Sequence, residues 1–411
     1  MANRRDQPPL ANSTLIPLPT QNRNARHHRA LLIAGIIFVA INLRPALTGV
    51  GPLISDIRQD TGLSNAALGL LTTLPLLAFG TVSALTPLVT RRLGLERTLA
   101  AALLLLGSGI LLRVAPSIAL LYVGTLLLGI AIAFGNVLLP TLVKRDFPEH
   151  TGIMTSLYSS VMGAGATIAA GISVPLSVAV GWRGSLAVWA VPAIAACLVW
   201  LPQLGSRTLP RSSGTLRESL HDLGRSPLAW QVACFMGLQS MTFYVVLAWL
   251  PSILQSRGLS PDYAGWMLAL SQGTGILGTM LVPTWAGRIT SQRPIIWALG
   301  LLEGVSLIGL LVPETTLAPL WVSIIGFVLG GTFGLALLFI VLRTADARTA
   351  TELSGMAQSI GYMLAAAGPI FFGYLHDLMQ SWSGPIVFLM LILVAKVVAG
   401  LGAGRPLIIK T

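Results

Sequence analysis

Charged side chains are scarce in this sequence of 411 residues. Asp, Glu, Lys and Arg together supply 10% of it, whereas a soluble domain has about 25%. Apolar residues supply 54%, and Gly and Pro are frequent without any repeating period, as is typical of membrane helices. This composition excludes water as the only solvent, and we expect a helical protein of the lipid bilayer.

Cysteine and histidine are also few. The two cysteines, Cys197 and Cys234, lie inside apolar runs, which indicates neither a disulfide framework nor a metal site. The five histidines are scattered over the tail, loops and helix ends, and no two form a His-x-x-x-His or Glu-paired set. We therefore expect no metal, no cofactor and no enzymatic activity.

Acidic residues are the scarcest charged kind, at 14 against 26 Lys and Arg, which gives a net charge of +12. Nucleic-acid binding would need these cations clustered on one face. Here they fall between apolar runs, so we expect no nucleic-acid partner.

Long apolar stretches dominate the chain. Crossing about 30 Å of hydrocarbon takes roughly 20 apolar residues in a helix. Twelve such stretches lie near residues 30–54, 66–89, 98–114, 118–143, 152–180, 184–202, 228–251, 263–286, 294–312, 318–342, 353–375 and 384–403. We expect an all-α integral membrane protein with twelve transmembrane helices in two pseudo-symmetric six-helix bundles.

The longest polar connection falls between the sixth and seventh stretches and divides the chain. The expected parts are a disordered cytoplasmic tail (1–29), a six-helix bundle (30–202), a cytoplasmic linker (203–227), a second six-helix bundle (228–403) and a cytoplasmic tail (404–411).

The distribution of basic residues predicts the orientation. With the amino terminus inside, 20 of the 26 Lys and Arg fall on the cytoplasmic side, and four fall outside: Arg58, Arg113, Arg183 and Arg257. The positive-inside rule then places both termini in the cytoplasm. We expect a multi-pass protein of the bacterial cytoplasmic (inner) membrane that acts as a monomer.

The two halves are similar to each other. A shift of 196 positions places Gly62-Leu63-Ser64 on Gly258-Leu259-Ser260 and Arg92 on Arg288, and a further offset of three places Lys144 on Arg343. Parallel six-helix repeats support rocking of one half against the other around a midplane site. The duplication therefore favours alternating access, although channels and membrane enzymes can also be duplicated.

Several motifs resemble one family. The loop after the second stretch, Arg91-Arg92-Leu93-Gly94-Leu95-Glu96-Arg97, resembles the signature of the major facilitator superfamily, with Arg91 where Asp is usual. More specific are Asn42-Leu43-Arg44-Pro45, Gly135-Asn136-Val137-Leu138-Leu139-Pro140 and Ser354-Gly355-Met356-Ala357-Gln358-Ser359. These look like the cyanate-permease and 2-nitroimidazole-transporter branch. The resemblance implies a proton-linked or facilitated carrier of a small, planar, polar or anionic compound.

Arg44 is the leading candidate for a substrate-binding residue. It lies about 15 residues into the first helix, where a guanidinium must find a cavity or a partner. A forked, permanently charged donor suits carboxylate, nitro or cyanate-like acceptors. Thr48 lies one turn further along the same face. The alternative is that Arg44 only holds carbonyl groups of neighbouring helices.

Other polar residues extend the candidate site. Helices 1, 4, 7 and 10 line the cavity in the superfamily that the chain resembles, and helix 4 carries Asn136, one turn before Pro140, which frees a backbone carbonyl. The further candidates for substrate binding, on helices 7, 8 and 11, are Gln239, Tyr244, Gln272, Gln358 and Tyr362. Each of them could instead pack between helices, because buried amides serve both purposes.

Glu303 and Lys396 are the only carboxylate and ammonium deep within spans. They lie at equal depth from the cytoplasmic end, which predicts an ion pair; snorkelling of Lys396 is the alternative. Helices 1, 4, 7 and 10 offer no buried carboxylate, so Glu303 is also the candidate proton site. Protons are a possible partner on this interpretation.

The function that we expect is secondary transport. An exporter of small nitro-aromatic solutes is placed ahead of an importer of a small anion such as cyanate. A channel or a membrane enzyme is the alternative from another class.

Overall fold

The computed structural model describes residues 21–63, 65–205, 223–312 and 316–409. Within these ranges regular structure is helical, apart from an isolated bridge between Thr344 and Ile409. Nine segments of this part are long and apolar enough to cross a membrane, and one of them, Pro148–Gly205, is long enough for two passes. The helices α11 and α14 complete the expected twelve crossings.

The N-terminal half comprises the helices up to α8. These are α1 (Gln21–Asn42), α2 (Pro45–Thr48), α3 (Ile54–Thr61), α4 (Asn65–Leu93), α5 (Leu95–Arg113), α6 (Ile118–Asp146), α7 (Thr151–Ala187) and α8 (Ala190–Trp200).

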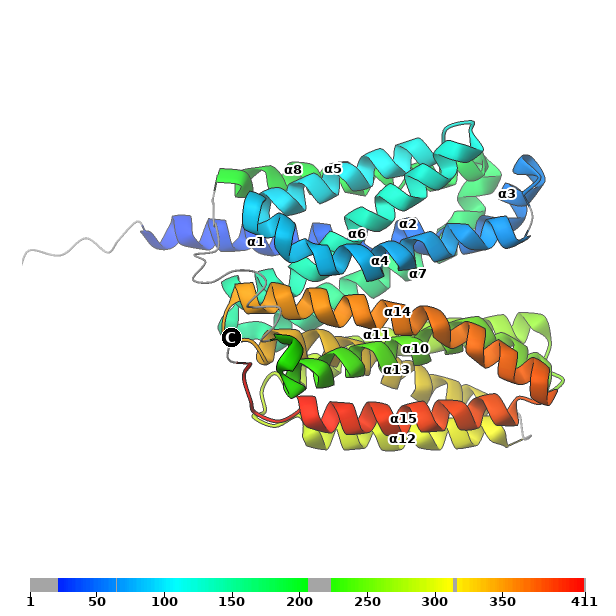
Figure 1. Cartoon of the computed structure of the whole chain (residues 1–411). Helices are drawn as coiled ribbons and strands as arrows, with labels where there is room; N and C mark the ends of the chain where they lie inside the picture. The colour runs from blue at the N-terminus through cyan, green and yellow to red at the C-terminus, as the bar shows by residue number, and fades with distance from the viewer. Residues whose placement is uncertain (1–20, 64, 206–222, 313–315, 410–411) are drawn as a thin grey trace, which may run out of the picture.

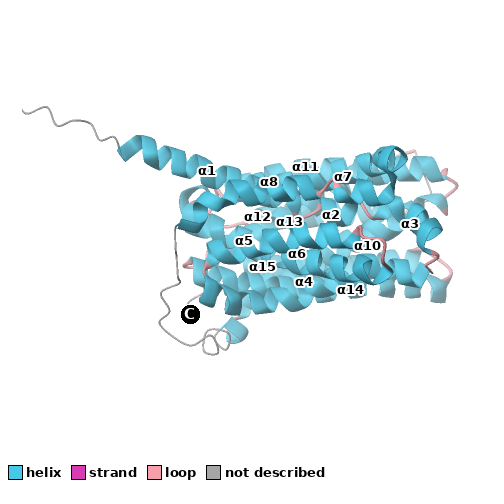
Figure 2. Cartoon of the chain, turned by 90° about the horizontal axis from the view of Figure 1, so that it is seen from above, coloured by secondary structure: helices cyan, strands magenta, loops and turns pink. Residues whose placement is uncertain are grey.

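The C-terminal half comprises six long helices. These are α10 (Pro227–Gln255), α11 (Pro261–Ala286), α12 (Arg293–Leu311), α13 (Ala318–Leu342), α14 (Ala347–Met379) and α15 (Ser383–Ala403). Figure 1 shows the two halves side by side, and Figure 2 shows that the long axes of their helices are roughly aligned.

Each half buries apolar side chains inside and also exposes apolar side chains outside. Leu104, Val178, Leu301 and Ile370 are examples of large side chains on the surface. A soluble protein would bury such residues, whereas lipid tails accept them. Glycines allow close helix packing inside the bundles: a Cβ on Gly330 would lie 1.8 Å from the Gly275 carbonyl oxygen.

Helix 1 is broken where the sequence predicts one continuous span. The helix α1 ends at Asn42, and α2 and a 3-10 turn (Gly51–Leu53) follow before α3. Pro45 contributes to the break because it has no N–H for the carbonyl of Ile41. The break exposes backbone carbonyls in the middle of the bundle.

The predicted tails and linker differ in part from the structure. The helix α1 begins at Gln21, so residues 21–29 are helical rather than part of a disordered tail; residues 1–20 lie outside the described residues. Most of the expected linker, 206–222, also lies outside them. The segment 404–409 is docked on the C-terminal half, where the Ile409 N–H donates to the Arg343 carbonyl at 2.8 Å.

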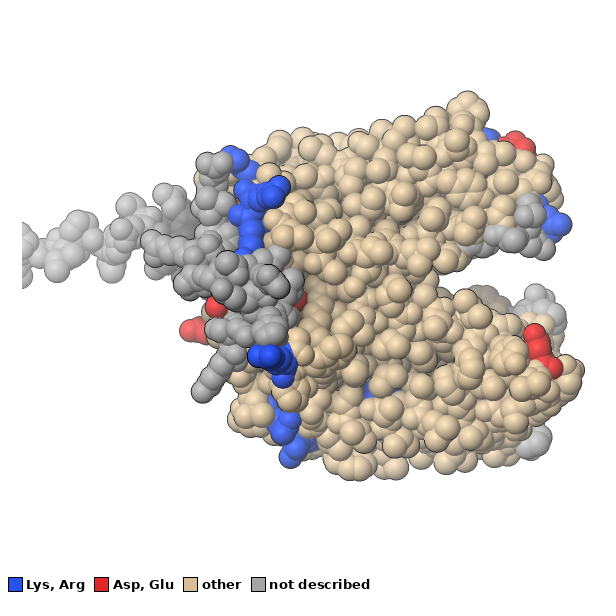
Figure 3. Space-filling model, in the orientation of Figure 1, with Lys and Arg blue, Asp and Glu red and all other residues tan. Residues whose placement is uncertain are grey.

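The two ends of the molecule differ in charge and in closure. We call the end formed by the turns after α4, α6, α11 and α13 the basic end, because it carries Arg91, Arg145, Arg288 and Arg343. Figure 3 shows Lys and Arg gathered at this end and a notch between the halves at the other.

Candidate substrate site

Arg44 lies at the break in helix 1 and faces the C-terminal half. Its guanidinium carbon is 5.6 Å from the centroid of the Phe333 ring on α13. It also interacts electrostatically with the hydroxyl groups of Tyr362 on α14 and Tyr244 on α10. No ion pair joins it to an acidic residue within the described ranges. The result is a cation surrounded by aromatic groups at the seam between the halves.

We call the rings of Phe333, Tyr362 and Tyr244 the aromatic wall, and further rings extend it on both sides of Arg44. The Tyr362 ring packs against Phe79 of α4 with centroids 5.0 Å apart, and the Tyr244 ring packs edge-on against Phe243 at 5.3 Å. Tyr158 of α7 lies close enough to Tyr362 to interact electrostatically. Flat ring faces and phenolic donors beside a guanidinium suit a flat solute with electron-rich oxygen atoms.

Asn136 and Gln358 form a polar bridge between the halves. Asn136 Nδ2 lies 3.5 Å from the Tyr362 hydroxyl, and Gln358 Nε2 donates to the Asn136 carbonyl at 2.7 Å. That carbonyl is the one that Pro140 leaves without its helical N–H. Gln358 also donates to Ser354 at 2.9 Å. In this conformation Gln358 therefore holds two helices together, as its packing interpretation predicted.

Among the described residues, three of the predicted site residues form no hydrogen bond with the Arg44 guanidinium or with the aromatic side chains around it. Gln239 donates within its own helix, to the Met236 carbonyl at 3.1 Å and to Ser240 at 2.7 Å. Gln272 of α11 is half-buried and lies 3.5 Å from its neighbour Ser271. Thr48 donates to the carbonyls of Arg44 and Ala166, so it ties helix 1 to α7.

The sequence analysis missed Phe333 and Tyr158. The internal repeat carries a signal for Phe333: the offset of 199 that aligns Lys144 with Arg343 also aligns Phe134 with Phe333. Phe333 lies on α13, the tenth transmembrane helix, which lines the cavity in the family that the chain resembles. Tyr158 has no such signal, because its repeat position is Ala357.

Glu303 and Lys396 form a buried ion pair inside the C-terminal half. Lys396 Nζ lies 2.5 Å from both carboxylate oxygens of Glu303, and the side chains are 2% and 0% exposed. A cavity of about 10 Å³ adjoins them, lined by Phe235 and Thr332 among others. The pair predicted from equal depth is present, and it excludes snorkelling of Lys396 in this conformation.

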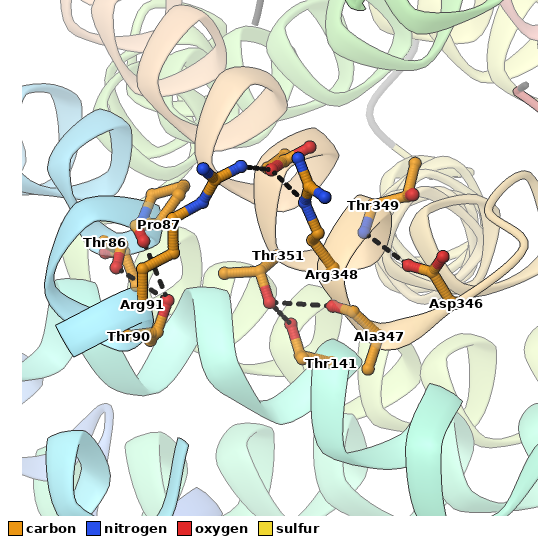
Figure 4. A network of polar contacts seen from close by, with 11 residues as sticks. Thr86, Pro87, Thr90, Arg91, Thr141, Asp346, Ala347, Arg348, Thr349 and Thr351 are labelled. Atoms are coloured by element: carbon orange, nitrogen blue, oxygen red, sulfur yellow. Dashed lines mark hydrogen bonds and ion pairs between the residues drawn. The ribbon is translucent and has the colours of Figure 1, made fainter. Parts of the chain in front are cut away.

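Polar contacts close the basic end beneath the site. Arg91 of α4 donates to Glu352 of α14 at 2.8 Å, and Arg348 donates to the same oxygen at 3.2 Å. The hydroxyls of Thr141 and Thr351 are 3.1 Å apart. In Figure 4, dashed lines run from Arg91 and Arg348, which lie on two helices, to one unlabelled carboxylate, that of Glu352. Because the Arg91–Glu352 and Thr141–Thr351 contacts join the two halves, a solute could pass through this end only after they break.

A duplicated helical bundle, with Arg44 among aromatic side chains at its seam and closure at one end, defines a membrane transport protein. The chain belongs to the major facilitator superfamily: the sequence model of that superfamily matches residues 31–373. The branch suggested by the motifs is confirmed by the relatives described next.

Three curated proteins are similar over most of the chain. The uncharacterised transporter YycB of Bacillus subtilis is 47% identical and covers 91% of this chain and 93% of its own length. The 2-nitroimidazole transporter of Escherichia coli is 42% identical (92% and 96%), and the cyanate transport protein CynX of Escherichia coli is 30% identical (84% and 90%).

Solved structures agree with the fold. The fucose:proton symporter FucP of E. coli has a TM-score of 0.73 at 13% identity and covers 92% of this chain and 99% of its own. The proton:xylose symporter XylE has a TM-score of 0.72 at 14% identity (92% and 95%). The superfamily match and the curated relatives make the chain a transporter rather than an enzyme.

Proposed function

We propose that this transporter carries a small, flat solute with a negative charge or a nitro group, which binds between Arg44 and the aromatic wall. The observation that carries the proposal is that the Arg44 guanidinium has no acidic partner among the described residues. A cation within a membrane bundle costs several kcal/mol unless it finds a partner. A carboxylate or nitro group bound across the seam is such a partner, and its ring stacks on Phe333 or a tyrosine.

The relatives support a flat or small anionic solute. One is named as a 2-nitroimidazole transporter and another as a cyanate transport protein. A third, named as a putative anionic 4-hydroxy-benzoate permease of Thauera aromatica, is 43% identical over 110 residues, 26% of this chain and 66% of its own. Export of a nitro-aromatic solute is our first proposal for the direction, and import of a small anion such as cyanate is the second.

The orientation follows from the basic end. The positive-inside rule places that end in the cytoplasm of a bacterial cell, with the chain in the cytoplasmic membrane and both termini inside. The notch then faces outward, so Arg44 is reached from outside in this conformation. The basic end must open before a solute can pass between Arg44 and the cytoplasm in either direction. Transport then needs one copy of the chain, because the site lies within one chain.

The experiment is counterflow in proteoliposomes with labelled 2-nitroimidazole, cyanate and 4-hydroxybenzoate tested separately. A carrier shows saturable uptake that internal unlabelled solute accelerates. Arg44→Ala should abolish it, whereas Arg92→Ala, an exposed arginine at the basic end, should not. Non-saturating flux, or unchanged counterflow in Arg44→Ala, would refute the proposal.

Coupling to protons is tested in the same vesicles. Concentrative movement driven by an imposed pH gradient, and lost in Glu303→Gln, would assign Glu303 as the proton site. Equilibration without accumulation would support facilitated transport or exchange instead.

A further inference from the structure

Arg113 is a buried arginine at the end of α5. It falls within the expected span 98–114 and counts among the four basic residues expected outside, and its side chain is 1% exposed. Its Nη1 donates to the Ala46 carbonyl at 2.6 Å, and its Nε and Nη2 have no hydrogen-bond partner among the residues that the structure describes. Burying a guanidinium with one neutral acceptor is costly, so the contact with helix 1 is notable.

The Ala46 carbonyl is available because helix 1 is broken there. In a continuous helix the N–H of Val50 would donate to it, but in this chain that N–H donates to the Leu47 carbonyl at 3.3 Å. Arg113 therefore supplies the donor that the irregular backbone lacks.

A second anchor lies on the other side of the break. Asn42 Nδ2 donates to the carbonyl of Pro192 on α8 at 3.0 Å and to that of Phe38 at 2.7 Å. Asn42 and Ala46 are four residues apart and are both buried within the N-terminal half. Arg44 lies midway between them and contacts the C-terminal half instead.

The close approach of α5 to its neighbour holds Arg113 in place. A Cβ on Gly124 of α6 would lie 2.4 Å from the backbone nitrogen of Arg113, and one on Gly109 would lie 2.7 Å from the nitrogen of Leu128. Only glycine fits at these crossings. The end of α5 is thus fixed against α6, and its arginine reaches across to helix 1.

We propose that Arg113, assisted by Asn42, is a positioning residue that fixes the break in helix 1 so that the Arg44 guanidinium stays directed at the seam. It raises affinity by keeping Arg44 in its binding orientation before the solute arrives. It does not touch the solute. The inference rests on the proposed binding role of Arg44.

The first test measures the break without any solute. Hydrogen exchange is followed in the full chain in nanodiscs for wild type, Arg113→Met, Arg113→Lys and the control Arg97→Met, which removes an exposed arginine from the same helix. Because a hydrogen bond from a charged group is lost, exchange of the amides at 47–50 should rise by about tenfold or more in Arg113→Met. It should rise less in Arg113→Lys and not at all in the control.

The second test separates positioning from general stability. Affinity for 2-nitroimidazole should fall about tenfold in Arg113→Met, but by less than about twofold when Arg44 is already Lys, because Arg113 then has no correctly placed guanidinium to hold. Equal losses in both backgrounds would overturn the inference. Unchanged hydrogen exchange at residues 47–50 would also overturn it, and so would an equal rise in exchange across the whole N-terminal half. Both outcomes count whether or not 2-nitroimidazole binds.

Discussion

A substitution at Gly355 should shift the equilibrium between the conformation that is closed at the basic end and the one that is open there. Gly355 lies on α14 against α4 of the other half, and a Cβ added there would lie 2.6 Å from the Ser83 carbonyl oxygen. Pro87 leaves that carbonyl without its helical N–H, so it faces Gly355 freely. Gly355→Ala would push the halves apart where they close the basic end.

The size of the effect follows from the contact. The obstructing atom belongs to the backbone, so it cannot rotate away as a side chain would. Overpacking by one methyl group costs about 1–3 kcal/mol, which corresponds to roughly 5- to 150-fold in the equilibrium between the two conformations. This cost destabilises the conformation closed at the basic end, because opening that end separates the added methyl group from the Ser83 carbonyl.

The assay is a distance distribution between spin labels at the basic end. Labels replace Arg92 of the N-terminal half and Arg288 of the C-terminal half, which are both exposed, after Cys197 and Cys234 are changed to Ser. Gly355→Ala should increase the population with the longer distance.

Two further glycines serve as controls. A Cβ on Gly273 would meet nothing within 4 Å, so Gly273→Ala should leave the distribution unchanged. A Cβ on Gly80 would meet the flexible Met363 side chain at 2.9 Å, so Gly80→Ala should have a smaller effect than Gly355→Ala. The reasoning is refuted if Gly355→Ala matches Gly273→Ala.

Three further predictions follow from the ion pairs. Glu352→Gln should raise the same long-distance population, since it weakens the contact with Arg91; an unchanged distribution would contradict this. Glu303→Leu and Lys396→Met should each destabilise the protein by about 3–5 kcal/mol, while the double variant recovers most of it, measured as thermal unfolding in detergent; additive losses would argue against a structural pair. The contact with Arg183 holds the pKa of the Asp60 carboxyl below its ordinary value near 3.8. The small stability that it gives is present above that pH and lost as the pH falls further, and Asp60→Asn should abolish this acid-side slope.

The length of the apolar runs was enough to predict the transmembrane helices. A backbone in hydrocarbon must satisfy its own hydrogen bonds, so long apolar runs become helices whatever their detailed packing. The boundary expected between residues 180 and 184 lies at the kink at Gly181, where φ is 74°. The break in helix 1 was not predicted, although Pro45 and Gly49 are visible in the sequence, because Pro75, Pro87 and other prolines lie within continuous helices.

The candidate site was predictable only in part, because a helix shows which residues share a face but not which face meets the seam. Arg44 could be identified from its depth alone. Tyr244 and Tyr362 lie near Arg44, whereas Gln239 and Gln272 form hydrogen bonds only within their own helices in the described part of the chain. The burial of Arg113 was not predicted, because an arginine at a helix end ordinarily reaches water. Its burial depends on a three-dimensional partner, the free Ala46 carbonyl, which no local pattern reveals.

The two copies of the repeat have diverged where they meet. Helix 1 is interrupted at Arg44, while its counterpart α10 runs unbroken from Pro227 to Gln255 and carries Ser240 at the matching position. One half therefore brings the charge and the other brings most of the rings. A solute with an acidic group at one end and a flat ring at the other can contact both Arg44 and the rings in only one orientation. Each solute molecule should therefore keep that orientation relative to the N-terminal half throughout the transport cycle.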